Sequence, residues 1–378
     1  MAFHLNSMCR LARWLGPWTP THVMPTGVTR HEVSFEGPNG PMRAWILRPE
    51  DRAPSGRLFV IHGLHFLGPE DPRLLRFLSA VAASGVEVFA PFIPTLLSLS
   101  LDEASVAETE AALRAATADP SDGPIGLFTI SFGSILGVRM MLTPEFQEKT
   151  EALMVFGGFC DWKDALRYSI TDRDTRADVV PPDPLNQPAI YMNLVADMEA
   201  APEQTHRVHD AWLAYIKATW GDPTMRDRAR FEPIARRLSQ TLEEEERALF
   251  LRGCGLAPGA REEVEGALVR ANARLNWLDP QAHLARLRCP LYIAHGADDD
   301  VVPVHHAEAM ASAATSCPRV TQAVTGLYGH TEHVGLSGLL KRGPEAFREL
   351  RTMMGLLRAI VSVSHPSQAH SSPVRYSS

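Results

Sequence analysis

Short apolar runs that alternate with helical segments constrain the fold of this 378-residue chain more than any other feature. Each run has the length of a buried strand, and the segments between them have apolar residues at helical spacing. One of these helices is expected to open at a capping box formed by Ser105 and Glu108. Such alternation predicts parallel strands with helices on both faces. The runs are LFVIHG (58–63), VEVFAPFI (86–93), IGLFTIS (125–131) and ALMVFGGF (152–159).

A predicted hairpin precedes this alternation of strands and helices, and a long helical segment interrupts it before it resumes. Residues 31–50 are rich in β-formers around a Gly-Pro-Asn-Gly turn, which predicts a hairpin. Residues 161–286 contain helical patterns and no clear buried strand. Strands are expected again within 289–300 and at 319–324, followed by a helix within 345–360. The interruption therefore predicts a helical insertion between two strands of one sheet.

The pattern divides the chain into a core, an insertion and two ends. The core comprises residues 31–160 and 287–362, and the insertion comprises 161–286. Residues 1–30 are expected to form a helical extension, because apolar residues there share one helical face. Residues 363–378 are rich in Ser, Pro and His, and are expected to be a disordered tail.

Composition excludes several classes of function. The formal charge is −7, from 37 basic and 44 acidic residues, which argues against nucleic acid or an anionic membrane as a partner. The five cysteines are scattered without a CxxC pair, so neither a disulfide framework nor a metal site is expected. No apolar run approaches the ~20 residues of a membrane span, and the first residues do not have the pattern of a secretory signal. We therefore expect a cytoplasmic protein.

Residues 129–134, Thr-Ile-Ser-Phe-Gly-Ser, lie where the strand 125–131 is expected to turn into a helix. A tight turn there exposes its apex residue, Ser131, at the N-terminus of the helix. Backbone N–H groups and the helix dipole favour negative charge at that position. A serine followed by Gly133 is a weak signal alone, but this context predicts a nucleophile.

Two further polar segments follow later strands of the same predicted sheet, whose carboxyl ends share one edge. Three aspartates at 298–300 come after the strand 291–295, and His330 and His333 follow the strand 319–324. A carboxylate can orient a histidine, and a histidine on such a loop can act as a general base. The order serine, acid, histidine is that of the nucleophile-elbow hydrolases.

With these segments, the chain resembles the α/β-hydrolase superfamily from about residue 31 to residue 360, apart from the insertion. This resemblance implies an α/β fold: a mostly parallel central sheet flanked by helices, with the insertion as a helical cap that covers the pocket and selects the substrate. It rests on His62-Gly63, on the serine turn at 129–133, on GADDDVVP at 296–303 and on Gly329-His330.

The resemblance also implies a role for each site residue. Ser131 is the expected nucleophile, Asp299 the acid and His330 the base. The oxyanion hole is expected to consist of the backbone N–H groups of Leu64 and Phe132.

Departures from the family pattern and competing residues leave alternatives open. Thr129 stands where the family usually has Gly or Ala, and Ser134 stands where a second Gly is common. Asp298, next to Asp299, is an alternative acid. Asp161 is another, because some members of the family carry the acid after the sixth strand. His333 is an alternative base.

These roles predict a serine hydrolase that cleaves a small-molecule carboxylic ester or related acyl compound through an acyl-enzyme, without a cofactor. Acyl transfer or carbon–carbon bond hydrolysis on the same triad stays open, as does non-catalytic binding of a small hydrophobic ligand. Dehalogenase and epoxide-hydrolase chemistry is disfavoured, because those relatives have Asp where this chain has Ser131. Five aromatic residues of the insertion either line the pocket or fill the core of the cap: Trp162, Tyr168, Trp212, Tyr215 and Trp220.

Overall fold

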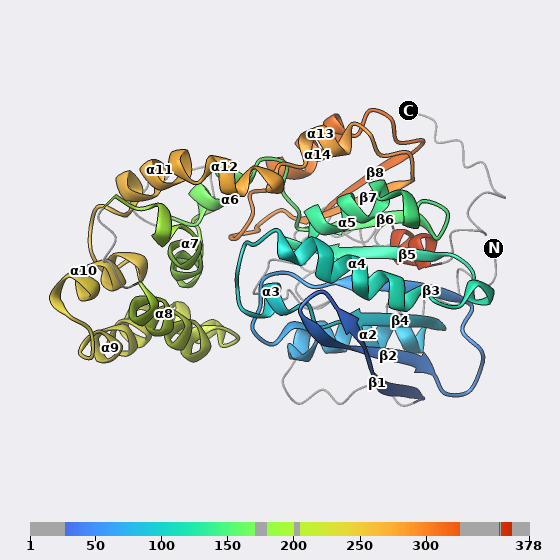
Figure 1. Ribbon diagram of the computed structural model, residues 1–378, viewed down its shortest axis with the longest axis horizontal. Helices are drawn as coiled ribbons and strands as arrows, with labels where there is room; N and C mark the ends of the chain where they lie inside the picture. Colours follow the sequence, from blue (N-terminus) through green and yellow to red (C-terminus); the bar gives the residue numbers. More distant parts are fainter. Residues whose placement is uncertain (1–26, 171–179, 200–204, 326–354, 356, 365–378) are drawn as a thin grey trace, which may run out of the picture.

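The computed structural model describes residues 27–170, 180–199, 205–325, 355 and 357–364. These residues form an eight-stranded sheet with the order β1-β2-β4-β3-β5-β6-β7-β8 (Figure 1). β2 is antiparallel to both β1 and β4, and the remaining neighbours are parallel. The strands are β1 (Val28–Gly37), β2 (Gly40–Pro49), β3 (Gly56–Ile61), β4 (Val86–Pro91), β5 (Ile125–Ile130), β6 (Thr150–Phe156), β7 (Leu291–Gly296) and β8 (Val320–Thr325).

Helices cover both faces of this sheet, as the alternation predicts. β3 illustrates the arrangement, because Leu58 and Val60 belong to one buried cluster and Phe59 and Ile61 to the other. The first cluster includes α2 and the helical residues 357–364, and the second includes α4, α5 and α14. The helices flanking the sheet are α2 (Pro72–Ala83), α3 (Pro94–Leu97), α4 (Ala104–Ala116), α5 (Gly133–Leu142) and α14 (His305–Ala313).

Two expectations about boundaries are wrong. Residues 28–30, assigned to the helical extension, are part of β1, because Val28 and Thr29 favour a strand and pair with β2. Residues 363 and 364, assigned to the tail, are helical and buried. A Cβ on Gly126 of β5 would lie 1.9 Å from the carbonyl oxygen of Val363, so this helix packs directly on the sheet. The remaining residues of both ends lie outside the described part of the chain.

The capping box expected at the start of α4 is also absent. α4 begins one residue earlier than that box, at Ala104. The buried carboxylate of Glu108 accepts hydrogen bonds from the backbone and the hydroxyl of Thr95 instead, at 3.0 and 2.5 Å. This side chain therefore joins α4 to α3 rather than closing its own helix.

Between β6 and β7 the described residues form helices and no strand. We call α6 to α13 the inserted helices. Trp162, Trp212 and Tyr215 are buried in a hydrophobic cluster that also includes residues of the sheet. Tyr168 is buried as well. No helix within the described ranges is long and apolar enough to cross a membrane. The inserted helices are α6 (Trp162–Tyr168), α7 (Gln187–Leu194), α8 (His206–Thr219), α9 (Arg228–Ser239), α10 (Glu244–Gly253), α11 (Ala260–Arg270), α12 (Asn272–Leu275) and α13 (Gln281–Leu284).

Ion pairs attach the inserted helices to the loop after β7. The guanidinium of Arg226, between α8 and α9, pairs with Asp300 and lies 3.1 Å from the carboxylate of Asp183. The Asp183 N–H also donates to the carbonyl of Asp300, at 3.0 Å. Both carboxylates are buried, with side-chain exposures of 7% for Asp183 and 9% for Asp300. Buried carboxylates of this kind depend on a paired cation, because desolvation of an unpaired charge is costly.

We therefore expect Arg226→Met to lower the free energy of unfolding by about 3 kcal/mol, since two buried carboxylates lose this cation. Urea denaturation at pH 7 measures the effect. The control is Arg228→Met, which removes a 2.8 Å pair with Glu232 in which the arginine side chain is 64% exposed. The control should lose less than about 1 kcal/mol. Equal losses in the two variants would contradict a structural role for the buried pair.

Candidate active site

Ser131 occupies the turn between β5 and α5, and its backbone is left-handed, with φ of 51°. This conformation costs an L-residue about 1–2 kcal/mol and is unusual for a serine. Hydrogen bonds hold it: the Ser131 N–H donates to Phe156 O, and the Ser131 carbonyl accepts the N–H of Ser134, both at 2.9 Å. The side chain is 8% exposed and stands at the N-terminus of α5. A strained residue at such a junction points to a function.

The turn after β3 lies directly against Ser131. A Cβ on Gly63 would be 3.2 Å from the Cβ of Ser131, and a Cβ on Gly133 would be 2.6 Å from the carbonyl oxygen of His62. Glycine is needed at position 133, because any side chain there would push the two turns apart, and the contact at Gly63 is tight. The sequence thus brings the expected oxyanion turn and the expected nucleophile together.

His62 fixes the shape of the turn that it begins. Its ring is buried; Nε2 accepts the N–H of Ile93 at 3.3 Å, and Nδ1 lies 2.7 Å from the carbonyl oxygen of Gly63. Because Nε2 is an acceptor, the proton is on Nδ1 and is donated to Gly63. Burial lowers the pKa of His62 to about 4, so the ring is neutral near pH 7.

The expected oxyanion donors, Leu64 and Phe132, flank these two turns. Neither backbone N–H has a protein acceptor within the described residues. Phe132 immediately precedes α5, where the first N–H groups of a helix have no intrahelical partner. Both amides are therefore available as hydrogen-bond donors beside Ser131.

The two departures from the family pattern are accommodated by glycines on neighbouring elements. Thr129 is fully buried, and a Cβ on Gly137, one turn into α5, would lie 2.3 Å from its methyl group. Ser134 is buried in the same way, and a Cβ on Gly158 would lie 3.0 Å from its Cβ. The larger side chains of Thr129 and Ser134 are thus accommodated because glycines, which have no side chain, lie opposite them.

Asp299 lies on the loop after β7, with its side chain almost fully buried. Its Oδ1 accepts the N–H groups of Val301 and Val302, both at 2.9 Å. Its Oδ2 lies 3.4 Å from Nε2 of His295, the buried penultimate residue of β7. The hydroxyl of Tyr168 donates to the backbone carbonyl of Val180 at 2.5 Å and lies 3.4 Å from the backbone carbonyl of Asp299. Tyr168 is named above only as an aromatic residue of the insertion, and His295 is not among the predicted site residues; the i, i+4 spacing of His295 and Asp299 was the available signal.

The alternative acids have other surroundings. Asp298 is exposed. Asp161 is also exposed and caps α6, where its side chain accepts the N–H groups of Lys163 and Asp164. The alternative bases cannot be compared in this way, because His330 and His333 lie outside the described residues. In sequence, His330 follows the end of β8 by five residues.

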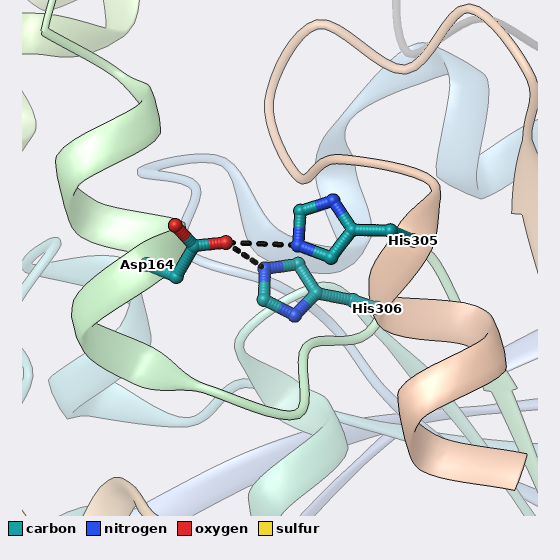
Figure 2. Close-up of side chains that lie close together, drawn as sticks. All are labelled: Asp164, His305 and His306. Atoms are coloured by element: carbon teal, nitrogen blue, oxygen red, sulfur yellow. Dashed lines mark hydrogen bonds and ion pairs between the residues drawn. The ribbon is translucent and has the colours of Figure 1, made fainter. Parts of the chain in front are cut away.

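One cluster has the composition of a metal site: Asp164 on α6 with His305 and His306 on α14 (Figure 2). The Asp164 carboxylate lies 2.9 Å from Nε2 of His305 and 3.4 Å from Nε2 of His306. However, Nδ1 of His306 accepts the N–H of Cys160 at 3.3 Å. A histidine that binds a metal through Nε2 keeps a proton on Nδ1 and donates it. The cluster is therefore better described as a contact between α6 and α14 than as a metal centre.

The left-handed backbone of Ser131 predicts an unusual order of stability among variants. Ser131→Gly should be about 1 kcal/mol more stable than Ser131→Ala, because glycine adopts positive φ without strain. The helical residue Ser134 is the control, and there the order should reverse, with Gly about 1 kcal/mol less stable than Ala. Thermal or urea unfolding of the four variants measures both differences. The same order at both positions would contradict the conformation assigned to Ser131.

Comparisons with known proteins give structural matches only. No family model and no curated protein matches the chain. An acylaminoacyl peptidase from Pyrococcus horikoshii matches 88% of this chain with 12% identity and a TM-score of 0.45, and this chain spans 41% of its length. The esterase Pf2001 from Pyrococcus furiosus matches 89% of this chain and 98% of its own, with 10% identity and a TM-score of 0.44. Carboxyl esterase 2 from the fungus Tuber melanosporum matches 93% of this chain and 91% of its own, with 13% identity and a TM-score of 0.47.

The sheet itself identifies the architecture. Its strand order, the second strand antiparallel to its neighbours, and the helices on both faces give this chain the α/β-hydrolase fold, with helices inserted between β6 and β7.

Proposed function

We propose that the chain is a serine hydrolase that cleaves a carboxylic ester or a related small acyl compound. Ser131 is the nucleophile, His330 the base and Asp299 the acid. The N–H groups of Leu64 and Phe132 bind the oxyanion. The reaction needs only water as a second substrate, because the acyl group is carried by the serine.

The observation that carries this proposal is the left-handed backbone of Ser131 at a strand–helix junction, packed against the turn 62–64. Strain of this kind persists only where the surrounding structure enforces it. A structural serine would gain nothing from that conformation, whereas a nucleophile gains access to substrate and the positive end of a helix. The buried carboxylate of Asp299, fixed by two amides, adds the second element of a triad.

The proposed reaction proceeds in two balanced steps. Ser131 Oγ attacks the carbonyl carbon while His330 takes the hydroxyl proton, and the oxyanion forms against the amides of Leu64 and Phe132. Collapse expels the alcohol, which receives that proton, and leaves an acyl-serine. Water then attacks the acyl-serine with the same base, which releases the acid and restores the serine. Each oxyanion donor is worth about 3 kcal/mol of transition-state stabilisation in a comparable enzyme.

We propose that the inserted helices act as a cap over this reaction. Trp220, after α8, approaches the ring of His65 with a centroid distance of 5.6 Å, and His65 follows the oxyanion turn. Four of the five aromatic residues considered above fill the core, so Trp220 is the one that remains a candidate for contact with substrate.

We expect a fluorophosphonate probe to label the wild type and not Ser131→Ala, because only an activated serine attacks phosphorus. A panel of p-nitrophenyl esters of increasing acyl length should be hydrolysed by the wild type, and kcat should fall by about six orders of magnitude in Ser131→Ala. Ser134→Ala, a buried serine one turn away, is the matched control and should keep both activities. Labelling of Ser131→Ala would rule out this nucleophile.

The same experiments separate the competing functions. A wild type that binds hydrophobic esters without labelling or turnover would be a non-catalytic binder. Preferential formation of a new ester when an alcohol is added would identify an acyltransferase. Turnover confined to carbon–carbon substrates would identify a hydrolase of that class.

The choice of acid makes a separate prediction. Asp299→Asn should lower kcat by about 10⁴-fold while the fold persists, because the amide oxygen can still accept the two backbone N–H groups but cannot stabilise an imidazolium. Asp161→Asn should leave kcat near that of the wild type, since Asn also caps helices well. Ester hydrolysis by both purified variants, with circular dichroism to verify folding, measures the contrast. A large loss in Asp161→Asn with none in Asp299→Asn would transfer the acid role to Asp161.

A further inference from the structure

We propose that His295 is a positioning residue that holds Asp299 in place for catalysis. This inference rests on the proposed function, because it assigns His295 a role through the acid of that triad. It concerns a buried side chain in β7 that does not itself touch the reacting atoms.

The contacts of His295 converge on the acid loop. Nε2 lies 2.9 Å from the carbonyl oxygen of Val302 and 3.4 Å from Oδ2 of Asp299. The side chains of His295 and Asp299 are 0% and 1% exposed. Both neighbours of Nε2 are oxygen acceptors, so this nitrogen carries a proton whatever the state of the rest of the ring.

Together these contacts close the loop from residue 296 to residue 302 into a braced unit. The Val302 N–H donates a hydrogen bond to Oδ1 of Asp299, while the Val302 carbonyl accepts a hydrogen bond from Nε2 of His295. The backbone of Val302 is thus held at its N–H by Asp299 and at its carbonyl by His295 of β7. The His295 N–H also lies 3.4 Å from Oδ2, the second carboxylate oxygen of Asp299.

This arrangement matters for the proposed reaction because the acid must meet the base at a fixed angle. Oδ1 is oriented by two backbone amides, so the plane of the carboxylate is set by the loop conformation. Without His295 the loop loses the hydrogen bond between β7 and the Val302 carbonyl, so the carboxylate can shift together with the loop. A displacement of about 1 Å in a catalytic group can reduce the rate about a hundredfold.

A double-mutant cycle with Asp299 tests the proposal. His295→Leu should lower kcat for a p-nitrophenyl ester about a hundredfold with little change in KM, because substrate binding does not involve this residue. His295→Gln should recover most of the loss, since its amide N–H₂ reaches nearly as far as Nε2. In the Asp299→Asn background, His295→Leu should cause little further loss, because the two residues act as one unit.

A second buried histidine controls for damage to the core. His306 is 1% exposed and accepts a hydrogen bond from the Cys160 N–H, and none of its contacts within the described residues involves Asp299. His306→Leu should therefore destabilise the protein without lowering kcat of the folded fraction. If His295→Leu does not fold, His295→Asn replaces it in the cycle, because its shorter side chain keeps a polar group but does not reach Val302.

Additive losses in the cycle, or equal kcat losses in the His295 and His306 variants, would overturn the positioning role. These outcomes differ from failure of the proposed function, which would appear as unchanged hydrolysis by Ser131→Ala. A non-additive cycle together with rescue by His295→Gln would establish that His295 acts through Asp299.

Discussion

The left-handed backbone of Ser131 is the constraint on which the site depends. The chain turns from β5 into α5 at Ser131, where φ is 51°. At this turn it passes very close to the turn after β3. That proximity removes side chains at Gly63 and Gly133 and buries the ring of His62 beneath the turn. The strain at one residue is thus offset by packing and hydrogen bonds distributed over three segments.

The loop after β7, residues 297–302, is held mainly by hydrogen bonds and ion pairs of buried polar groups. Asp299 and Asp300 are adjacent and both nearly buried, yet their carboxylates have separate partners. Asp299 binds backbone amides of its own loop, whereas Asp300 binds Arg226 from the inserted helices. Because desolvated carboxylates require such partners, the loop is fixed both to the sheet and to the insertion.

Periodicity predicted the sheet and its helices well, because strands buried on both faces leave an unambiguous apolar pattern. The predicted strands match β3 to β8 to within a few residues. Local polar patterns were less reliable. The Ser105–Glu108 capping box did not form, because the carboxylate of Glu108 accepts hydrogen bonds from Thr95 instead.

For the site, sequence order placed the serine and the acid on loops at the carboxyl ends of their strands, but not the groups that hold them. Thr129 departs from the family pattern for a reason visible only in three dimensions, the missing side chain of Gly137. The roles of His295 and Arg226 could not be predicted from the sequence either. A buried hydrogen-bond donor is recognised only when the acceptors around it are known. His330 lies outside the described residues, so its role stays a prediction.

For the proposed hydrolase, the attachment of the inserted helices limits how substrate can reach Ser131. Asn193 of α7 accepts the N–H of Leu101 at 2.6 Å and donates to the carbonyl of Leu99 at 2.8 Å, where the backbone is again left-handed. With the Arg226 ion pairs and the contact of Trp220 with His65, the insertion is joined to three separate loops of the core. One hydrophobic cluster also runs through both parts.

Rigid-body opening of the insertion would break these contacts together and expose part of that cluster to water. Opening would separate the ion pair of Arg226 with Asp300, the hydrogen bonds of Asn193 and the apolar contacts at the same time, so its cost in free energy is high. Local movement of a loop is less costly, because loops make fewer buried contacts. Substrate access is therefore better explained by adjustment of a loop at the edge of the insertion than by swinging of the inserted helices as a body.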